Sequence, residues 1–204
     1  SIKINFVFLE KSFLFTKFVK YNQLKNIENM GTAKSNPFWG IVMEMLNQKF
    51  KEAFGKDVKE VLEFVMANLN SDFEKQCLVC YFLGKGAPLQ VSDDVFKRAA
   101  AVAVEARAAS EKRYGGPTPV TIDGKKYYSQ VISFYDSDEF NYAFGCATVF
   151  FDENGVPVGL KDRYDFDMAG HRDKMAEKLT ELMAKIEHSK LGGKPYDIYY
   201  GIHD

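Results

Sequence analysis

The change of residue pattern at Gly115-Gly116-Pro117 constrains the fold more than any other feature of the chain. Before this point apolar residues recur at the spacing of a helix, and after it they alternate with polar residues as in a strand. Adjacent glycine and proline residues interrupt both kinds of structure. The sequence therefore predicts an α+β protein, with helices in the first half and a sheet in the second.

Four amphipathic helices are predicted in the first half. Asn36 precedes Pro37 as an N-cap precedes a first helical residue, and Gly55 ends the same helix. Ser71 and Glu74 have the spacing of a capping box that opens another helix. Short links between the helices predict a small bundle. The predicted helices cover residues 36–54, 58–69, 71–83 and 92–113.

The second half is predicted to form a curved antiparallel sheet, or half-barrel, that carries one long helix. The Asp123-Gly124 turn closes a first hairpin, and Glu153-Asn154-Gly155 closes a second. The hairpin strands are predicted at 120–122, 127–134, 140–151 and 156–166, the helix at 169–188 and a last strand at 196–202.

Charge and cysteine content exclude several classes of protein. The formal net charge is −1, so the chain has no general basic character of the kind that nucleic-acid binding needs. The chain has three cysteines, and this odd number argues against a disulfide framework: Cys77, Cys80 and Cys146. Cys77 and Cys80 have the spacing of a zinc-binding pair, but no second pair completes the site. We therefore expect free thiols buried in a helix.

The aromatic content and the first residues each leave two interpretations open. Aromatic residues make up 15% of the chain, which indicates a Phe-rich core or a groove for a lipid tail. Residues 1–29 are either an upstream extension, because Met30-Gly31 looks like a second start, or a genuine N-terminal arm. Neither a signal peptide nor a membrane span is recognisable in the sequence.

One run of residues carries most of the candidate chemistry. Between Asp162 and Arg172 it combines carboxylates, a phenol, an imidazole and a guanidinium at the junction of a predicted strand and a predicted helix. Such a set suits attack at phosphorus, with carboxylates on a divalent cation and an arginine on the phosphoryl oxygens. The free N–H groups of the helix start also favour a phosphate.

Strand alternation predicts which side chains between Asp162 and Asp165 share a face. Asp162 and Tyr164 share one face of a regular strand, whereas Arg163 and Asp165 share the other. The two carboxylates meet only if the strand bulges or ends near Asp165.

The spacing Asp-x-Tyr-Asp-x5-His-Arg, formed by residues 162, 164, 165, 171 and 172, resembles the motif of colicin M and related bacteriocins. The Asn154-Gly155 turn, the amphipathic stretch after the motif and the later Gly193-Lys194-Pro195-Tyr196 are also similar to that family. The resemblance implies hydrolysis of lipid II at the phosphoester between undecaprenol and pyrophosphate, and dependence on a divalent cation, preferably Mg²⁺. It implies that Asp162, Tyr164, Asp165, His171 and Arg172 are all needed.

The roles of the motif residues follow from the resemblance and from their chemistry. Asp165 is predicted to be a metal ligand or nucleophile, and Asp162 a metal ligand or an orienting group. His171 is predicted to carry the proton, Arg172 to clamp the phosphate and Tyr164 to position them. Asp167 is interpreted as a turn residue or N-cap. His188 and His203 are interpreted as surface residues, although His203 could reach the sheet edge beside the site.

The resemblance covers roughly the last 90 residues, and the two regions before them are assigned by position from the layout of that family. We expect an arm or import segment at 1–35, a helical receptor-binding or translocation region at 36–114 and a catalytic domain at 115–204. The expected partners are lipid II, an outer-membrane receptor, the import machinery and an immunity protein, with no nucleic acid and a monomeric state. The protein would be made in the cytoplasm, released, and active in the target periplasm.

Two alternatives remain open at this point. No short import box is recognisable near Ser1 or Met30, so the chain could instead be a catalytic effector module of another toxin. It could also be a non-enzymatic binding or immunity protein on a related scaffold. The intact set of motif residues argues against the second alternative.

Overall fold

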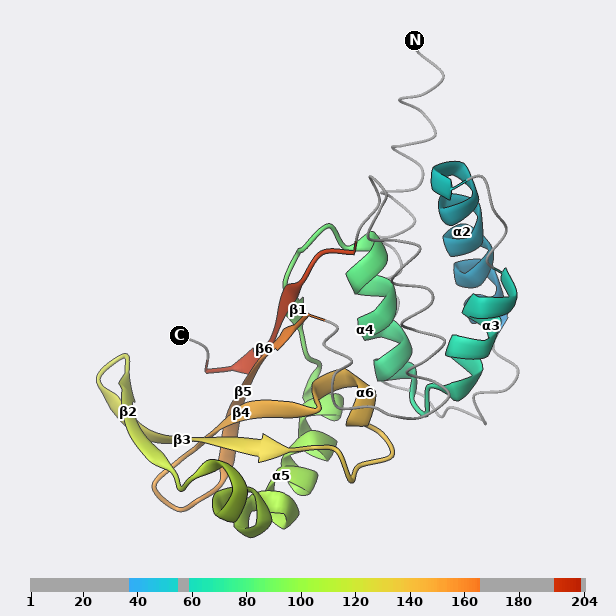
Figure 1. The fold of residues 1–204 in the computed structure, drawn as a ribbon. Helices are drawn as coiled ribbons and strands as arrows, with labels where there is room; N and C mark the ends of the chain where they lie inside the picture. The colour runs from blue at the N-terminus through green and yellow to red at the C-terminus, as the bar shows by residue number, and fades with distance from the viewer. Residues whose placement is uncertain (1–36, 55–58, 166–192, 203–204) are drawn as a thin grey trace. The chain divides into compact units, whose positions relative to one another are not determined.

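The computed structural model describes residues 37–54, 59–165 and 193–202 (Figure 1). The chain divides into two compact units, residues 1–32 and 33–204, and every described residue belongs to the second. Helices and a mixed, open, six-stranded sheet confirm the α+β class. The elements are α2 Pro37–Phe54, α3 Lys59–Asn68, α4 Asp72–Leu83, β1 Leu89–Gln90, α5 Asp93–Tyr114, β2 Thr118–Ile122, β3 Lys125–Ser133, α6 Asn141–Phe144, β4 Cys146–Phe151, β5 Pro157–Tyr164 and β6 Tyr196–Gly201.

The predicted helix starts are confirmed where they are described. Ser71 caps α4 by accepting a hydrogen bond from the Glu74 backbone N–H, and Ser92 caps α5 by accepting one from Val95. Asn36 and Gly55, the predicted ends of α2, lie outside the described residues. Helix α2 also binds α4, because the Trp39 indole N–H donates to Asp72 at 2.9 Å.

The sheet runs in the order β1-β6-β5-β4-β3-β2. The predicted Asp123-Gly124 turn joins β2 to β3, and its residues have φ values of 51° and 74°, as the turn of a tight hairpin requires. Strand β1 was not predicted and pairs parallel with β6, so the sheet is mixed rather than purely antiparallel. The predicted helix at 169–188 lies outside the described residues.

The prediction of a strand from Phe140 onward is wrong for its first residues. Residues Asn141–Phe144 form α6, and β4 begins only at Cys146. Phe140, Ala143 and Phe144 are all buried, which is the spacing of a helical turn; in a strand, the last two would point to opposite faces. Gly145 then takes a positive φ of 55° that separates the turn from the strand.

One face of the sheet, which we call the inner face, packs against α4 and α5. Tyr196 and Tyr164 contact α4 residues, whereas Gln130 and Tyr200 contact α5 residues. Helix α5 thus packs on the sheet, a placement that its amphipathic pattern alone did not indicate. By strand register the inner face carries Gln130, Ile132, Ala147, Val149, Phe151, Leu160, Asp162, Tyr164, Tyr196, Ile198 and Tyr200.

Candidate active site

Strand β5 positions the first residues of the motif as alternation predicts. Asp162 and Tyr164 lie on the inner face, opposite Ile198 and Tyr196 of β6. Arg163 points the other way, is exposed, and donates to the Asp197 carboxylate at 3.2 Å. The strand ends at Tyr164, so Asp165 is the first residue after it and is exposed. The strand end that the two carboxylates need in order to meet is therefore present.

The Asp162 carboxyl is partly buried, and its surroundings oppose its negative charge. Burial raises its pKa from 3.8 to about 7, more strongly than a hydrogen bond from the Arg163 backbone N–H lowers it. The nearby charge of Asp165 contributes to this rise. The two motif carboxylates thus interact electrostatically, and a cation between them would relieve their repulsion.

Tyr164 is a buried residue of the inner face. Its side chain is 7% exposed, and burial holds its pKa well above the usual value. Its ring stacks on Tyr196 at a centroid distance of 5.3 Å and meets Tyr81 of α4 at 6.0 Å in an edge-on arrangement. This packing brings α4 directly against the motif strand, and the positioning role of Tyr164 stays a prediction.

The Gly193–Tyr196 segment, which is the second part of the resemblance, forms hydrogen bonds with helix α4. The Lys194 backbone N–H donates to the Tyr81 carbonyl at 3.0 Å, and the Tyr196 hydroxyl donates to the Cys77 carbonyl at 2.8 Å. A Cβ atom on Gly193 would lie 1.9 Å from a ring carbon of Tyr81, so only glycine fits there without a shift.

The remaining predicted site residues lie outside the described part of the chain. These are His171 and Arg172, together with Asp167, His188 and His203, for which the sequence assigned lesser roles. Their convergence with Asp162 and Asp165 therefore stays a prediction.

A divalent cation fits the two described carboxylates in its donor chemistry. Mg²⁺ prefers oxygen ligands, often takes only one or two carboxylates and keeps several waters. Among the described residues, no group of three or more His, Cys, Asp or Glu side chains could hold a metal ion. Asp162 and Asp165 would therefore share the cation with water, with substrate oxygens or with residues outside that part.

A second buried carboxyl, Glu74, lies at the start of α4 and was predicted only as a capping residue. It is fully buried and accepts hydrogen bonds from the backbone N–H groups of Asn70 at 2.8 Å and Tyr142 at 2.9 Å. Burial nevertheless raises its pKa from 4.5 to about 7.

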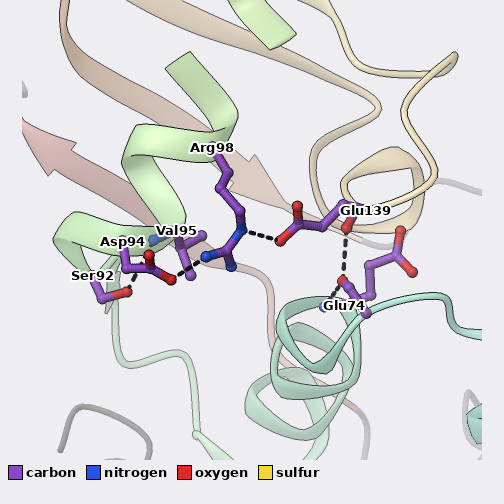
Figure 2. Close-up of polar contacts among 7 residues, drawn as sticks. Glu74, Ser92, Asp94, Val95, Arg98 and Glu139 are labelled. Atoms are coloured by element: carbon purple, nitrogen blue, oxygen red, sulfur yellow. Dashed lines mark hydrogen bonds and ion pairs between the residues drawn. The ribbon is translucent and has the colours of Figure 1, made fainter. Parts of the chain in front are cut away.

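A polar network surrounds the start of α4 (Figure 2). The Ser71 hydroxyl donates to the Glu139 carbonyl at 2.7 Å, and Arg98 of α5 donates to the Glu139 carboxylate at 2.8 Å. Arg98 also pairs with Asp94, one helical turn earlier. The network joins α4, α5 and the β3–β4 connection at a place distant in sequence from the motif.

The cysteines are free, as predicted. Cys77 and Cys80 are buried in α4, and Cys146 is partly buried. Burial raises the pKa of Cys77 well above its usual value and that of Cys80 to about 12. Such thiols are poor nucleophiles and poor metal ligands at neutral pH, so they belong to the core.

Comparison of the chain with protein-family models, with curated proteins and with solved structures gives no match. None of the helices that the structure describes combines the length and the apolar character that crossing a membrane requires.

Proposed function

We propose that this protein is a metal-dependent phosphoester hydrolase that cleaves lipid II between undecaprenol and pyrophosphate, as a bacteriocin active in the target periplasm. One observation carries the proposal: Asp162 lies near the end of β5 and Asp165 directly follows it, close enough for the charge of Asp165 to contribute to the raised pKa of Asp162. The same pair belongs to the motif that also contains Tyr164, His171 and Arg172.

The proposed reaction adds water across the phosphoester. Its oxygen bonds to phosphorus, the bond from phosphorus to the undecaprenyl oxygen breaks, and a proton passes to that oxygen. Undecaprenol and a pyrophosphate-bearing head group result. His171 moves the proton and Arg172 holds the phosphoryl oxygens, while Asp162 and Asp165 would hold the cation. The cation, Mg²⁺ by preference, would neutralise charge that develops on the phosphoryl group.

The direct test incubates the purified chain with lipid II and Mg²⁺, with and without a chelator. We expect free undecaprenol only when Mg²⁺ is available. In ¹⁸O-labelled water the label should enter the head-group phosphate, because water attacks phosphorus. Intact lipid II after long incubation, or label in undecaprenol, would contradict the proposal.

A cellular test addresses the compartment. Lipid II displays its head group on the periplasmic face, so the chain should lyse cells when it carries an added secretion signal and be far less toxic without one. Added from outside, it should kill only cells that have a matching receptor and import machinery and lack the immunity protein. Equal killing from both compartments would point to another substrate.

The catalytic-effector alternative predicts the same chemistry with another route of delivery. Only the addition of the protein to cells from outside distinguishes this alternative from the bacteriocin. An effector module cleaves lipid II and kills from the periplasm, but it does not kill cells when it is added outside. A non-enzymatic binding protein would give no undecaprenol in any arm.

A further inference from the structure

Tyr81 of helix α4 contacts the motif strand with its aromatic ring. This residue is 6% exposed and lies in the second half of the helix. Its ring meets the Tyr164 ring edge-on, with 63° between the ring planes. Tyr164 in turn stacks on Tyr196 at an angle of 28°, so its ring has aromatic neighbours from α4 and from β6.

The segment that precedes β6 contacts both the ring and the backbone of Tyr81. Gly193 lies against its ring, and the Lys194 N–H binds its carbonyl. The Tyr196 hydroxyl binds the Cys77 carbonyl one turn earlier in α4. The segment Gly193–Tyr196 therefore holds the end of α4 against β5. Tyr81 is the α4 side chain that contacts Tyr164 of the motif.

Asp162 lies on the same side of β5 as Tyr164, two residues away. This side of β5 packs against α4 through the contact of Tyr164 with Tyr81, so Asp162 lies on the side of the strand that faces α4. A displacement of Tyr164 would consequently be transmitted along β5 to Asp162 and to the strand end that sets Asp165.

We propose that Tyr81 is a positioning residue for the motif, which holds the Tyr164 ring and thereby the end of β5 that carries Asp162 and Asp165. This inference rests on the proposed function for its kinetic part. It extends the site into α4, within residues 36–114, where the motif itself places no residue.

The test compares two disturbing variants with two matched controls. Tyr81→Leu removes the ring, and Gly193→Ala forces the ring to move because a Cβ atom needs its space. Phe73→Leu removes a buried ring at the other end of α4, where it packs on Phe140 and Phe144. Gly40→Ala adds a methyl group at a position with no atom within 4 Å.

We expect Tyr81→Leu and Gly193→Ala to lower kcat per folded molecule about 10- to 100-fold, since small misplacements of reacting groups cost this much. KM should change by less than about threefold, because substrate binding in the ground state is not removed. Tyr81→Phe should retain wild-type kcat, and both controls should do so after correction for the folded fraction.

A second readout does not depend on lipid II. In protein with ¹³C-labelled tyrosine rings, the Tyr164 resonance, assigned with Tyr164→Phe, should shift in Tyr81→Leu and Gly193→Ala and stay in place in Phe73→Leu. Unchanged kcat in both disturbing variants, an equal loss in Phe73→Leu, or an unmoved Tyr164 resonance would overturn the inference. A wild-type chain that does not cleave lipid II would overturn the proposed function, and the resonance would then decide the structural link alone.

Discussion

Two carboxyls, Glu74 and Asp162, have similarly raised pKa values but different hydrogen-bond surroundings. Both have a pKa raised to about 7, and burial is the largest cause in each. Glu74 is enclosed by backbone N–H groups of Tyr142, Asn70 and Ser71, all of which favour its charged form. Asp162 receives one such hydrogen bond, from Arg163. Each group also faces a like charge, Glu139 beside Glu74 and Asp165 beside Asp162.

The two carboxyls therefore differ in how many backbone N–H groups favour their charged forms. The surroundings of Glu74 join α4 to the residues around α6 and satisfy both carboxylate oxygens. Within the described part of the chain, no cationic side chain is among the groups that act on the pKa of Asp162. The same is true of Glu74, so the lack of a described cationic neighbour does not separate the two groups. The raised pKa alone therefore does not identify a site, and variants of the two carboxyls have to distinguish them.

The largest expected effect is on catalysis. Asp165→Ala and His171→Ala should lower lipid II cleavage by about 10²- to 10⁴-fold or more, because a proton carrier alone supplies that much. Circular dichroism and the unfolding midpoint should stay close to wild type. Asp197→Ala, which removes an exposed carboxylate on the neighbouring strand, is the control and should remain active. Wild-type turnover in either motif variant would refute the assigned roles.

Glu74→Ala should act on stability instead. It leaves the N–H groups of Asn70 and Tyr142 buried without their acceptor, which should lower the free energy of unfolding by roughly 2–4 kcal/mol. Denaturant unfolding monitored by circular dichroism measures the loss. Glu63→Ala, at a half-exposed ion pair with Lys59, should change stability by less than about 0.5 kcal/mol. Loss of cleavage per folded molecule in Glu74→Ala would erase the distinction between the two carboxyls.

Local sequence signals predicted much of this arrangement. Serine caps gave the starts of α4 and α5, the Asp123-Gly124 pair gave a hairpin, and alternation placed Asp162 and Tyr164 on one face. Each of these features depends on residues within a few positions of one another, so a single sequence is enough to read them.

Features that depend on distant contacts were not predicted. The apolar run from Phe140 reads equally well as a strand, and only its packing on Phe73 and Phe134 shows the helical turn. Strand β1 has only two residues and exists because it pairs with β6. Tyr81 beside Tyr164 joins segments more than 80 residues apart, and no pattern around either residue indicates the contact.

The pH dependence of stability should differ between the two carboxyls. Because both have a folded-state pKa above the unfolded value, each stabilises the fold fully below about pH 4, and this contribution is lost as pH rises through about 7. Asp162→Asn should flatten the profile and raise stability at pH 8 by about 1–3 kcal/mol. The full rise in pKa is worth roughly 4 kcal/mol at about 1.4 kcal/mol per unit, and partial exposure of the carboxyl reduces this.

Glu74→Gln is the contrasting variant. It should lower stability at every pH between 4 and 8. Each carboxylate oxygen of Glu74 accepts a hydrogen bond from a backbone N–H, and the amide N–H₂ of Gln would place a donor against one of these donors. Thermal unfolding between pH 4 and 8 measures both effects. Parallel profiles for the two variants would show that the like charge of Asp165 and the N–H groups around Glu74 do not distinguish these sites.

The smallest expected effect comes from Arg98, which links the Glu74 side of the comparison to α5. Its ion pairs with Asp94 and Glu139 are partly exposed, so Arg98→Ala should cost no more than about 1 kcal/mol. The variant also leaves the Glu139 charge unbalanced, and that charge already raises the pKa of Glu74. A ¹³C carboxyl titration should therefore show a further rise in the pKa of Glu74 and none in that of Asp162. A shift of both groups would mean that α4 transmits charge from one carboxyl to the other, and the two sites would then have to be treated as one coupled system.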